Sequence, residues 1–186
     1  MKSKNEIKIQ RAKIFIVVLF SLLIACFLYL NYITKDIDKS NTLEQKIAKT
    51  EQMKTTATNF GRSLDKDDFE TVKTLLTADC EYFIGDTTLV GKNAIAGSYE
   101  SNMTEGRNKM DKLEWGKSEI ETISETEYYV HFTDYLTHKD ETHIHRCKQK
   151  VSVNSDNKIF KIVHINNAEE QQNLKAFYKR VGISTK

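Results

Sequence analysis

The chain has 186 residues, of which 29% are charged and 39% are hydrophobic, and none is proline. These values predict one soluble globular domain with an appendage, and they exclude a proline-rich linker. Residues 1–33 carry five basic side chains and one acidic one, against a net charge of +2 for the whole chain. The remainder is therefore mildly acidic, and we expect no nucleic-acid partner.

An uncharged apolar segment, IFIVVLFSLLIACFLYLNYI, covers residues 14–33. As a helix it would rise ~30 Å, about the thickness of the hydrocarbon core of a bilayer. Lysine and arginine crowd its N-terminal flank, so the positive-inside rule places residues 1–13 in the cytoplasm. The sequence thus predicts a single-pass anchor in the cell membrane, with the C-terminal domain outside.

The same segment allows two alternatives to an uncleaved anchor. A cleaved secretory signal would need a shorter apolar core followed by small residues. The stretch LIAC, residues 23–26, resembles a bacterial lipobox, in which Cys26 would be lipidated. The apolar run continues through residues 27–30, where a lipoprotein normally turns polar. We therefore favour the uncleaved anchor and keep a lipoprotein modified at Cys26 as the alternative.

Beyond the anchor, residues 34–42 are interpreted as a polar stalk and residues 43–186 as the folded domain. A capping box formed by Asp67 and Glu70 marks the start of a helix. From residue 113 the period of the apolar pattern changes to two, which predicts strands joined by hairpin turns. In chain order, we expect helices at 34–63, 67–79 and 91–103, strands at 80–86, 113–123, 128–137, 143–153 and 158–166, and a last helix at 166–182 capped by Asn167.

Residues 59–100 combine an acidic helix start, an LLTAD lead into a strand and a GKNAI lead into a helix. This combination, followed by a meander of long strands, resembles the nuclear transport factor 2-like superfamily, which includes ketosteroid isomerase, scytalone dehydratase and SnoaL-like polyketide cyclases. The resemblance covers about residues 43–166. It implies an α+β fold, a cone-shaped half-barrel in which a curved antiparallel sheet packs on three helices, here preceded by one transmembrane helix. These motifs mark a fold rather than a chemistry.

The ketosteroid isomerases of this superfamily use a tyrosine on the first helix, a base aspartate on the first strand and a second acid on the next-to-last strand. The matching positions here hold Phe60, Gly85 and Gln149, and none of these side chains can transfer a proton. A slip of one residue would bring Asp86 to the second position, and steroid isomerisation is still not expected. The resemblance therefore leans away from an enzyme, and no cofactor is expected.

The stretch HIHRC places His143, His145 and Cys147 at every second position of an expected strand. Alternate side chains of a strand point to one face, so these three face the interior of the cone if Gln149 does. We interpret the strip as one polar wall of a cavity. The residues expected to line this cavity are Phe60, His143, His145, Cys147, Gln149, Phe160 and His164.

Two sharper interpretations of this strip compete with a plain cavity wall. A zinc or copper site is one, because imidazole and thiolate are good ligands. Same-face neighbours on one strand lie ~6.5–7 Å apart, so further ligands would have to come from a second strand, where His131 and His164 are available. A Cys–His nucleophile pair is the other, but no third group is identifiable to orient the base. We therefore expect no metal site.

His145, His164 and Asp134 are the candidates for acid–base catalysis, although Asp134 is expected to face water. We favour a tethered, non-catalytic module that binds a small ligand or a protein. One alternative is an isomerase, dehydratase or cyclase that uses these side chains. Another is a scaffold subunit of an envelope assembly, because a short cytoplasmic tail, one membrane helix and an outward domain form the layout of type IV secretion assembly factors. A homodimer through the sheet is also expected.

Overall fold

The computed structural model describes residues 4–184, and the side chains of residues 21–24, 26–32 and 42–184. The chain divides into two units, Met1–Ala48 and Lys49–Lys186. Helix α1 (Lys4–Leu64) runs through the boundary between them.

The first unit consists of the N-terminal part of α1. Its large apolar side chains between Leu22 and Tyr32 are exposed wherever they are described. Among the residues that the structure describes, no helix is both long enough and apolar enough to cross a membrane. The anchor predicted at residues 14–33 is thus not supported by the structure, and residues 14–20, 25 and 33 of that segment lie outside the described side chains.

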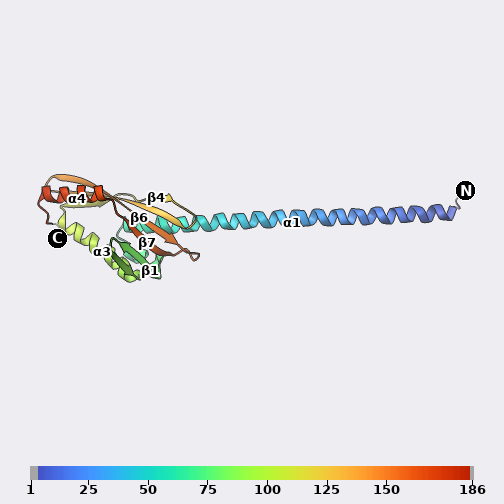
Figure 1. Ribbon diagram of the computed structural model, residues 1–186, viewed down its shortest axis with the longest axis horizontal. Helices are drawn as coiled ribbons and strands as arrows, with labels where there is room; N and C mark the ends of the chain where they lie inside the picture. The colour runs from blue at the N-terminus through green and yellow to red at the C-terminus, as the bar shows by residue number, and fades with distance from the viewer. Residues whose placement is uncertain (1–3, 185–186) are drawn as a thin grey trace. The chain divides into compact units, whose positions relative to one another are not determined.

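The second unit is built on a seven-stranded sheet of order β2-β1-β7-β6-β5-β3, in which β4 also pairs with β5 (Figure 1). Most neighbouring strands are antiparallel, but β1 and β7 run parallel. The predicted purely antiparallel sheet is therefore wrong at this pair. These two strands are not joined by a hairpin, so the connection between them does not require them to run antiparallel. The strands are β1 (Leu76–Ile84), β2 (Thr87–Val90), β3 (Lys112–Trp115), β4 (Glu119–Thr122), β5 (Glu127–His138), β6 (Glu141–Val153) and β7 (Ile159–Ile165).

Three helices cover the inner face of this curved sheet: the last turns of α1, then α2 (Phe69–Leu75) and α3 (Lys92–Lys109). Each supplies fully buried side chains to one core, including Phe60, Val72 and Ile95. Burial of each such side chain contributes about 1.5–3 kcal/mol relative to exposure. The predicted α+β class and the packing of a curved sheet on three helices are confirmed.

The single strand predicted at residues 113–123 is two strands in the structure. Gly116 donates from its backbone N–H to the Thr133 carbonyl at 2.7 Å. A Cβ atom at Gly116 would lie 2.8 Å from that same oxygen, so the close approach requires glycine. Ser118 then donates from its N–H and its hydroxyl to the Asp65 carboxylate, both at 2.8 Å. The break redirects the chain, so that β4 pairs with the first half of β5.

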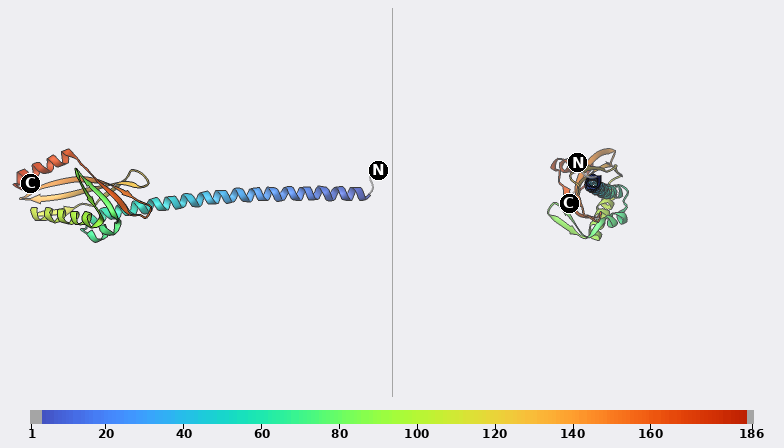
Figure 2. Two further views of the ribbon diagram at one scale, coloured as in Figure 1. Left: turned by 60° about the horizontal axis from the view of Figure 1, so that its bottom comes forward. Right: turned by 90° about the vertical axis from the view of Figure 1, so that its right-hand side faces the viewer.

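The last helix, α4 (Ala168–Val181), lies along the part of β6 that β7 does not reach (Figure 2). Strand β6 pairs with β5 along its whole length, but with β7 only from Lys148 onward. In a second, smaller apolar cluster, Phe177 and Val181 of α4 pack with Met110 and Leu136. The helix thus closes one end of the inner face.

Candidate functional site

A cavity of about 310 Å³ lies between α4, residues 145–147 of β6 and residues 164–165 of β7. Strand alternation points the side chains of His145 and Cys147 toward it from β6. The side chain of His164 joins them from β7, because His164 pairs with Gln149 and thus shares its face. The helix contributes Glu170 and Tyr178. Three of the residues predicted to line a cavity therefore meet at one place.

The N-terminus of α4 fixes one wall of this cavity. Asn167 caps the helix, because its side-chain oxygen accepts from the N–H groups of Glu169 and Glu170. The predicted cap is confirmed. The Glu170 carboxylate also accepts a long hydrogen bond, at 3.5 Å, from the backbone N–H of Arg146. Arg146 lies in the part of β6 that does not pair with β7. Sequence reasoning missed Glu170, because its helical pattern says nothing about which strand the helix covers.

Asp134 completes a compact polar cluster in this region. It pairs with His145 across β5 and β6, so both side chains lie on the inner face. The ligand-type atoms of Asp134, His145 and Cys147 all lie within 4.8 Å of one another. Asp134 is half-buried and forms no hydrogen bond with the described side chains or backbone. The expectation that Asp134 faces water is wrong, because the cross-strand register turns it inward.

Burial sets the protonation states in the cluster. It raises the pKa of the Asp134 carboxyl to about 7, and the nearby Asp65 carboxylate adds to this shift. It also raises the pKa of the Cys147 thiol to about 12, with further contributions from Asp134 and Glu170. Burial lowers the pKa of His145, although Glu170 opposes this effect. Near neutral pH the cluster therefore contains a thiol, a neutral imidazole and a partly protonated carboxyl group. A thiol held in this state is a poor nucleophile.

His143 lies next to this cluster, under α4. Its ring stacks on Phe177 with centroids 5.2 Å apart and planes 17° apart. The buried atoms His143 Nε2 and His145 Nδ1 have no hydrogen-bond partner in the described part of the chain. The closest approach of a carboxylate to His145 Nδ1 is that of Glu170, at 4.0 Å, which is too long for a hydrogen bond. Unpaired buried nitrogens are uncommon in folded proteins, so both need an explanation.

Two of the predicted cavity residues lie deeper, in a closed layer. Tyr99 donates its hydroxyl to Gln149 Oε1 at 2.6 Å, and Gln149 Nε2 donates to the Tyr82 hydroxyl at 3.2 Å. The rings of Tyr82 and Tyr99 stack, and Phe60 meets Tyr99 edge to face. Phe60 and Gln149 therefore fill the base of the cone and do not line the 310 Å³ cavity.

Phe160 lies outside the cavity, with 44% of its surface exposed. The pairing of β6 with β7 shifts register between Ser152 and Val153. Across this irregularity Ile159 and Ile162 both point inward, so simple alternation fails there. His164 lies beyond the shift and does reach the cavity, where burial lowers its pKa.

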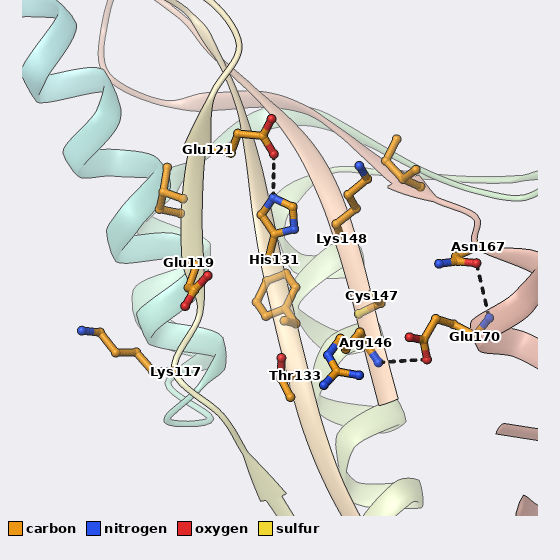
Figure 3. Close-up of a pocket in the computed structure, with 13 residues that line it drawn as sticks. Lys117, Glu119, Glu121, His131, Thr133, Arg146, Cys147, Lys148, Asn167 and Glu170 are labelled. Carbon is orange, nitrogen blue, oxygen red and sulfur yellow. Dashed lines mark hydrogen bonds and ion pairs between the residues drawn. The ribbon is translucent and has the colours of Figure 1, made fainter. Parts of the chain in front are cut away.

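A second hollow, of about 710 Å³, extends over the outer side of β5 and β6 toward β4 (Figure 3). Figure 3 shows His131 pointing to Glu121, with its Nε2 atom 2.9 Å from the carboxylate. Charged side chains of both signs, among them Lys117, Glu119 and Lys148, line this hollow together with apolar side chains such as Ile120 and Phe132. Cys147 and Glu170 line both this hollow and the 310 Å³ cavity. His131, considered above as a metal ligand, lies here rather than beside His145.

No family model and no curated protein matches this sequence. Solved structures match its fold. A protein assigned as a polyketide cyclase from Xanthomonas campestris pv. campestris has a TM-score of 0.53 and 11% identity, over 66% of this chain and 96% of that chain. The epoxide hydrolase/cyclase-like enzyme SalBIII, which acts in pyran ring formation in the polyether salinomycin, has a TM-score of 0.51 and 11% identity, over 64% of this chain and 94% of that chain. The domain therefore has the nuclear transport factor 2-like fold, and identities this low show the fold alone.

Proposed function

We propose that the domain binds a small organic molecule with a polar head group in the cavity between the sheet and α4. The observation that carries this proposal is the set of inner-face polar groups without partners. One of them, His145 Nδ1, belongs to the lining of the cavity. The other two, His143 Nε2 and the Asp134 carboxyl group, lie beside the cavity on the same face of the sheet. A buried polar group without a hydrogen bond costs about 1–3 kcal/mol. A ligand that pairs with these groups recovers that free energy on binding.

A second candidate function is acid–base catalysis on the bound molecule. It is favoured by the neighbouring pair Asp134 and His145, whose groups differ in protonation. The pKa of Asp134 is raised to about 7, so its carboxyl group can both donate and accept a proton near neutral pH. The imidazole of His145 is neutral there and can accept one. Proton transfer of this kind would suit a dehydratase, an isomerase or a cyclase, and the fold neighbours named as cyclases support this candidate by analogy.

Binding can be tested by screening the full chain with small ketones, carboxylic acids and epoxides, using ligand-observed NMR and thermal shift. Asp134→Asn and His145→Gln should weaken the hits by about tenfold, the equivalent of one hydrogen bond. His131→Gln is the matched control, since it changes a histidine of β5 on the opposite face. Equal affinity in all four proteins, or no hits in the wild type, would contradict the proposal.

Catalysis can be tested on any ketone that binds. Exchange of its α-hydrogens for deuterium, followed by NMR, reports proton abstraction without knowledge of the natural product. We expect exchange in the wild-type protein and at least about a hundredfold slower exchange in Asp134→Asn. A wild type that binds the ketone without exchange would leave the non-catalytic binding module as the function.

We also propose that residues 14–33 tether this domain to the cell membrane. The uncharged sequence of this segment and the basic residues before it support the tether. Fractionation of cells that produce the full chain should recover it with membranes, whereas a chain that starts at residue 43 should be released. The predicted partner protein, the envelope scaffold and the homodimer stay predictions.

A further inference from the structure

We propose that His143, His145 and Glu170 bind a divalent transition-metal ion. The inference deepens the proposed function, because two of these side chains, His145 and Glu170, line the same cavity. It rests on that cavity being a binding site. The donor set is two imidazoles and one carboxylate. Such a set suits zinc, iron(II) or copper(II), and three protein ligands leave coordination positions for water or for the organic molecule.

The three side chains converge from two elements of the fold. His143 and His145 share the inner face of β6, with ring centroids 6.4 Å apart and planes 29° apart. Glu170 approaches from the first turn of α4, with its Oε2 atom 4.0 Å from His145 Nδ1. One ligand atom from each of the three residues lies within 4.8 Å of the other two. A neighbouring helix thus supplies the third ligand that one strand alone cannot.

The two unpaired nitrogens belong to this same set. His143 Nε2 and His145 Nδ1 are both buried, and neither has a hydrogen-bond partner in the described chain. Each imidazole nitrogen without a proton has a lone pair that can bind a metal ion. Both histidines that carry an unpaired nitrogen belong to the converging set, so one shared cation would account for both.

The geometry requires only a small adjustment. Zinc lies about 2.0–2.2 Å from nitrogen and oxygen ligands, so tetrahedral ligand atoms lie about 3.3 Å apart. The observed spread of up to 4.8 Å exceeds this spacing by about 1.5 Å at most, which rotation of the side chains can close. Glu170 has room for this rotation, because 18% of its side chain is exposed and its hydrogen bond from the Arg146 backbone is long, at 3.5 Å.

A competing set shares His145 and adds Asp134 and Cys147, which also lie within 4.8 Å of one another. Only one of the unpaired buried nitrogens, His145 Nδ1, belongs to the competing set, whereas the set with His143 and Glu170 contains both of them. A Glu170 oxygen also lies 4.0 Å from His145 Nδ1. The structure therefore favours the set with two histidines and one glutamate.

The test uses the full chain without a histidine tag, treated with a chelator and then titrated with Zn²⁺ by calorimetry. We expect one Zn²⁺ per chain. Loss of an outer-shell partner already weakens metal binding by about 10–100-fold, so Glu170→Gln and His143→Phe should weaken it by at least about a hundredfold. Phenylalanine at position 143 keeps the ring stack on Phe177. Thermal unfolding of the metal-free variants checks that they fold. His131→Gln and Cys147→Ser should bind as tightly as the wild type.

Cobalt(II) in place of Zn²⁺ identifies the ligands directly, because a thiolate ligand adds a charge-transfer band to its spectrum. We expect no such band. A thiolate band that disappears in Cys147→Ser would overturn the assignment in favour of the competing set. No binding by the wild type, or equal loss in His131→Gln, would overturn it altogether. Organic hits that still bind in the presence of chelator would then leave the proposed function standing, whereas metal binding without any organic hit would remove only that function.

Discussion

The inner face of the sheet carries polar side chains at two levels, and the levels are satisfied differently. At the base, Gln149 links the hydroxyl groups of Tyr82 and Tyr99, and each contact is a hydrogen bond of ordinary length. At the other level, under α4 and here called the mouth, His143 and His145 of the same strand hold buried nitrogens that have no hydrogen-bond partner among the described residues. Both levels follow from one alternation along β6, so the difference lies in what covers them. Packed helices close the base, while a single helix covers the mouth and leaves a cavity.

Buried polar side chains therefore have two different roles in this domain. A satisfied network rigidifies the fold, whereas an unsatisfied one marks a place where something else binds. Substitutions at the base should therefore cost stability and leave binding unchanged. Substitutions at the mouth should do the reverse.

The largest effect on stability is expected from Gln149→Ala. The change leaves two buried tyrosine hydroxyls without their partner and opens a void, and it should lower the free energy of unfolding by about 3 kcal/mol. Urea unfolding of the metal-free protein measures this decrease in the free energy of unfolding. A cost below about 1 kcal/mol would mean that the base is no better satisfied than the mouth.

Asp134→Asn should change how stability depends on pH. The folded pKa is raised from 3.8 to about 7, so between these values the folded state holds a proton that the unfolded state releases. The stability from this group is complete below about pH 4 and is lost as the pH rises toward 7. Relative to the variant, the chelated wild type should lose on the order of 2 kcal/mol between about pH 5 and pH 8. Parallel pH curves would show that Asp134 is not buried in this way.

Asn167→Ala removes the cap of α4, the helix that covers the mouth. Loss of an N-cap costs about 1 kcal/mol, and here it should also weaken binding in the cavity, because the backbone N–H of Glu170 donates to the Asn167 side chain. Asp68→Ala is the matched control. Asp68 caps α2 by the same kind of bond, to Thr71 N–H, and should cost similar stability without an effect on binding. Equal effects of both changes on binding would contradict a special role for α4.

The smallest effect on stability is expected from His145→Gln. Its ring makes no hydrogen bond in the described chain, so the free energy of unfolding should change by less than about 0.5 kcal/mol. Ligand affinity should nevertheless fall. If this change destabilised the chelated protein as strongly as Gln149→Ala, the distinction between base and mouth would disappear.

Sequence patterns predicted those parts of the site that depend on a single strand. Alternation alone placed His143, His145 and Cys147 on one face with Gln149, and the structure has the same parity. Alternation failed at Phe160, because a register shift is invisible without the partner strand. Contacts between distant elements were also out of reach. The parallel pairing of β1 with β7 is one example, and the approach of Glu170 to His145 is another.

The attachment of α4 has a consequence for the rate at which the cavity exchanges its contents. Near its N-terminus Glu170 meets the Arg146 N–H, and at its other end Lys139 donates from its ammonium group to the Val181 carbonyl at 2.8 Å. Lys139 belongs to the tight turn between β5 and β6, where its φ is 49°. Arg180 adds an ion pair with Glu141 of β6, at 3.1 Å. A helix held at both ends must break these contacts and its apolar packing before it lifts from the sheet. Bound molecules should therefore leave slowly, and the amide hydrogens of α4 should exchange with solvent at a rate that falls when the cavity is filled.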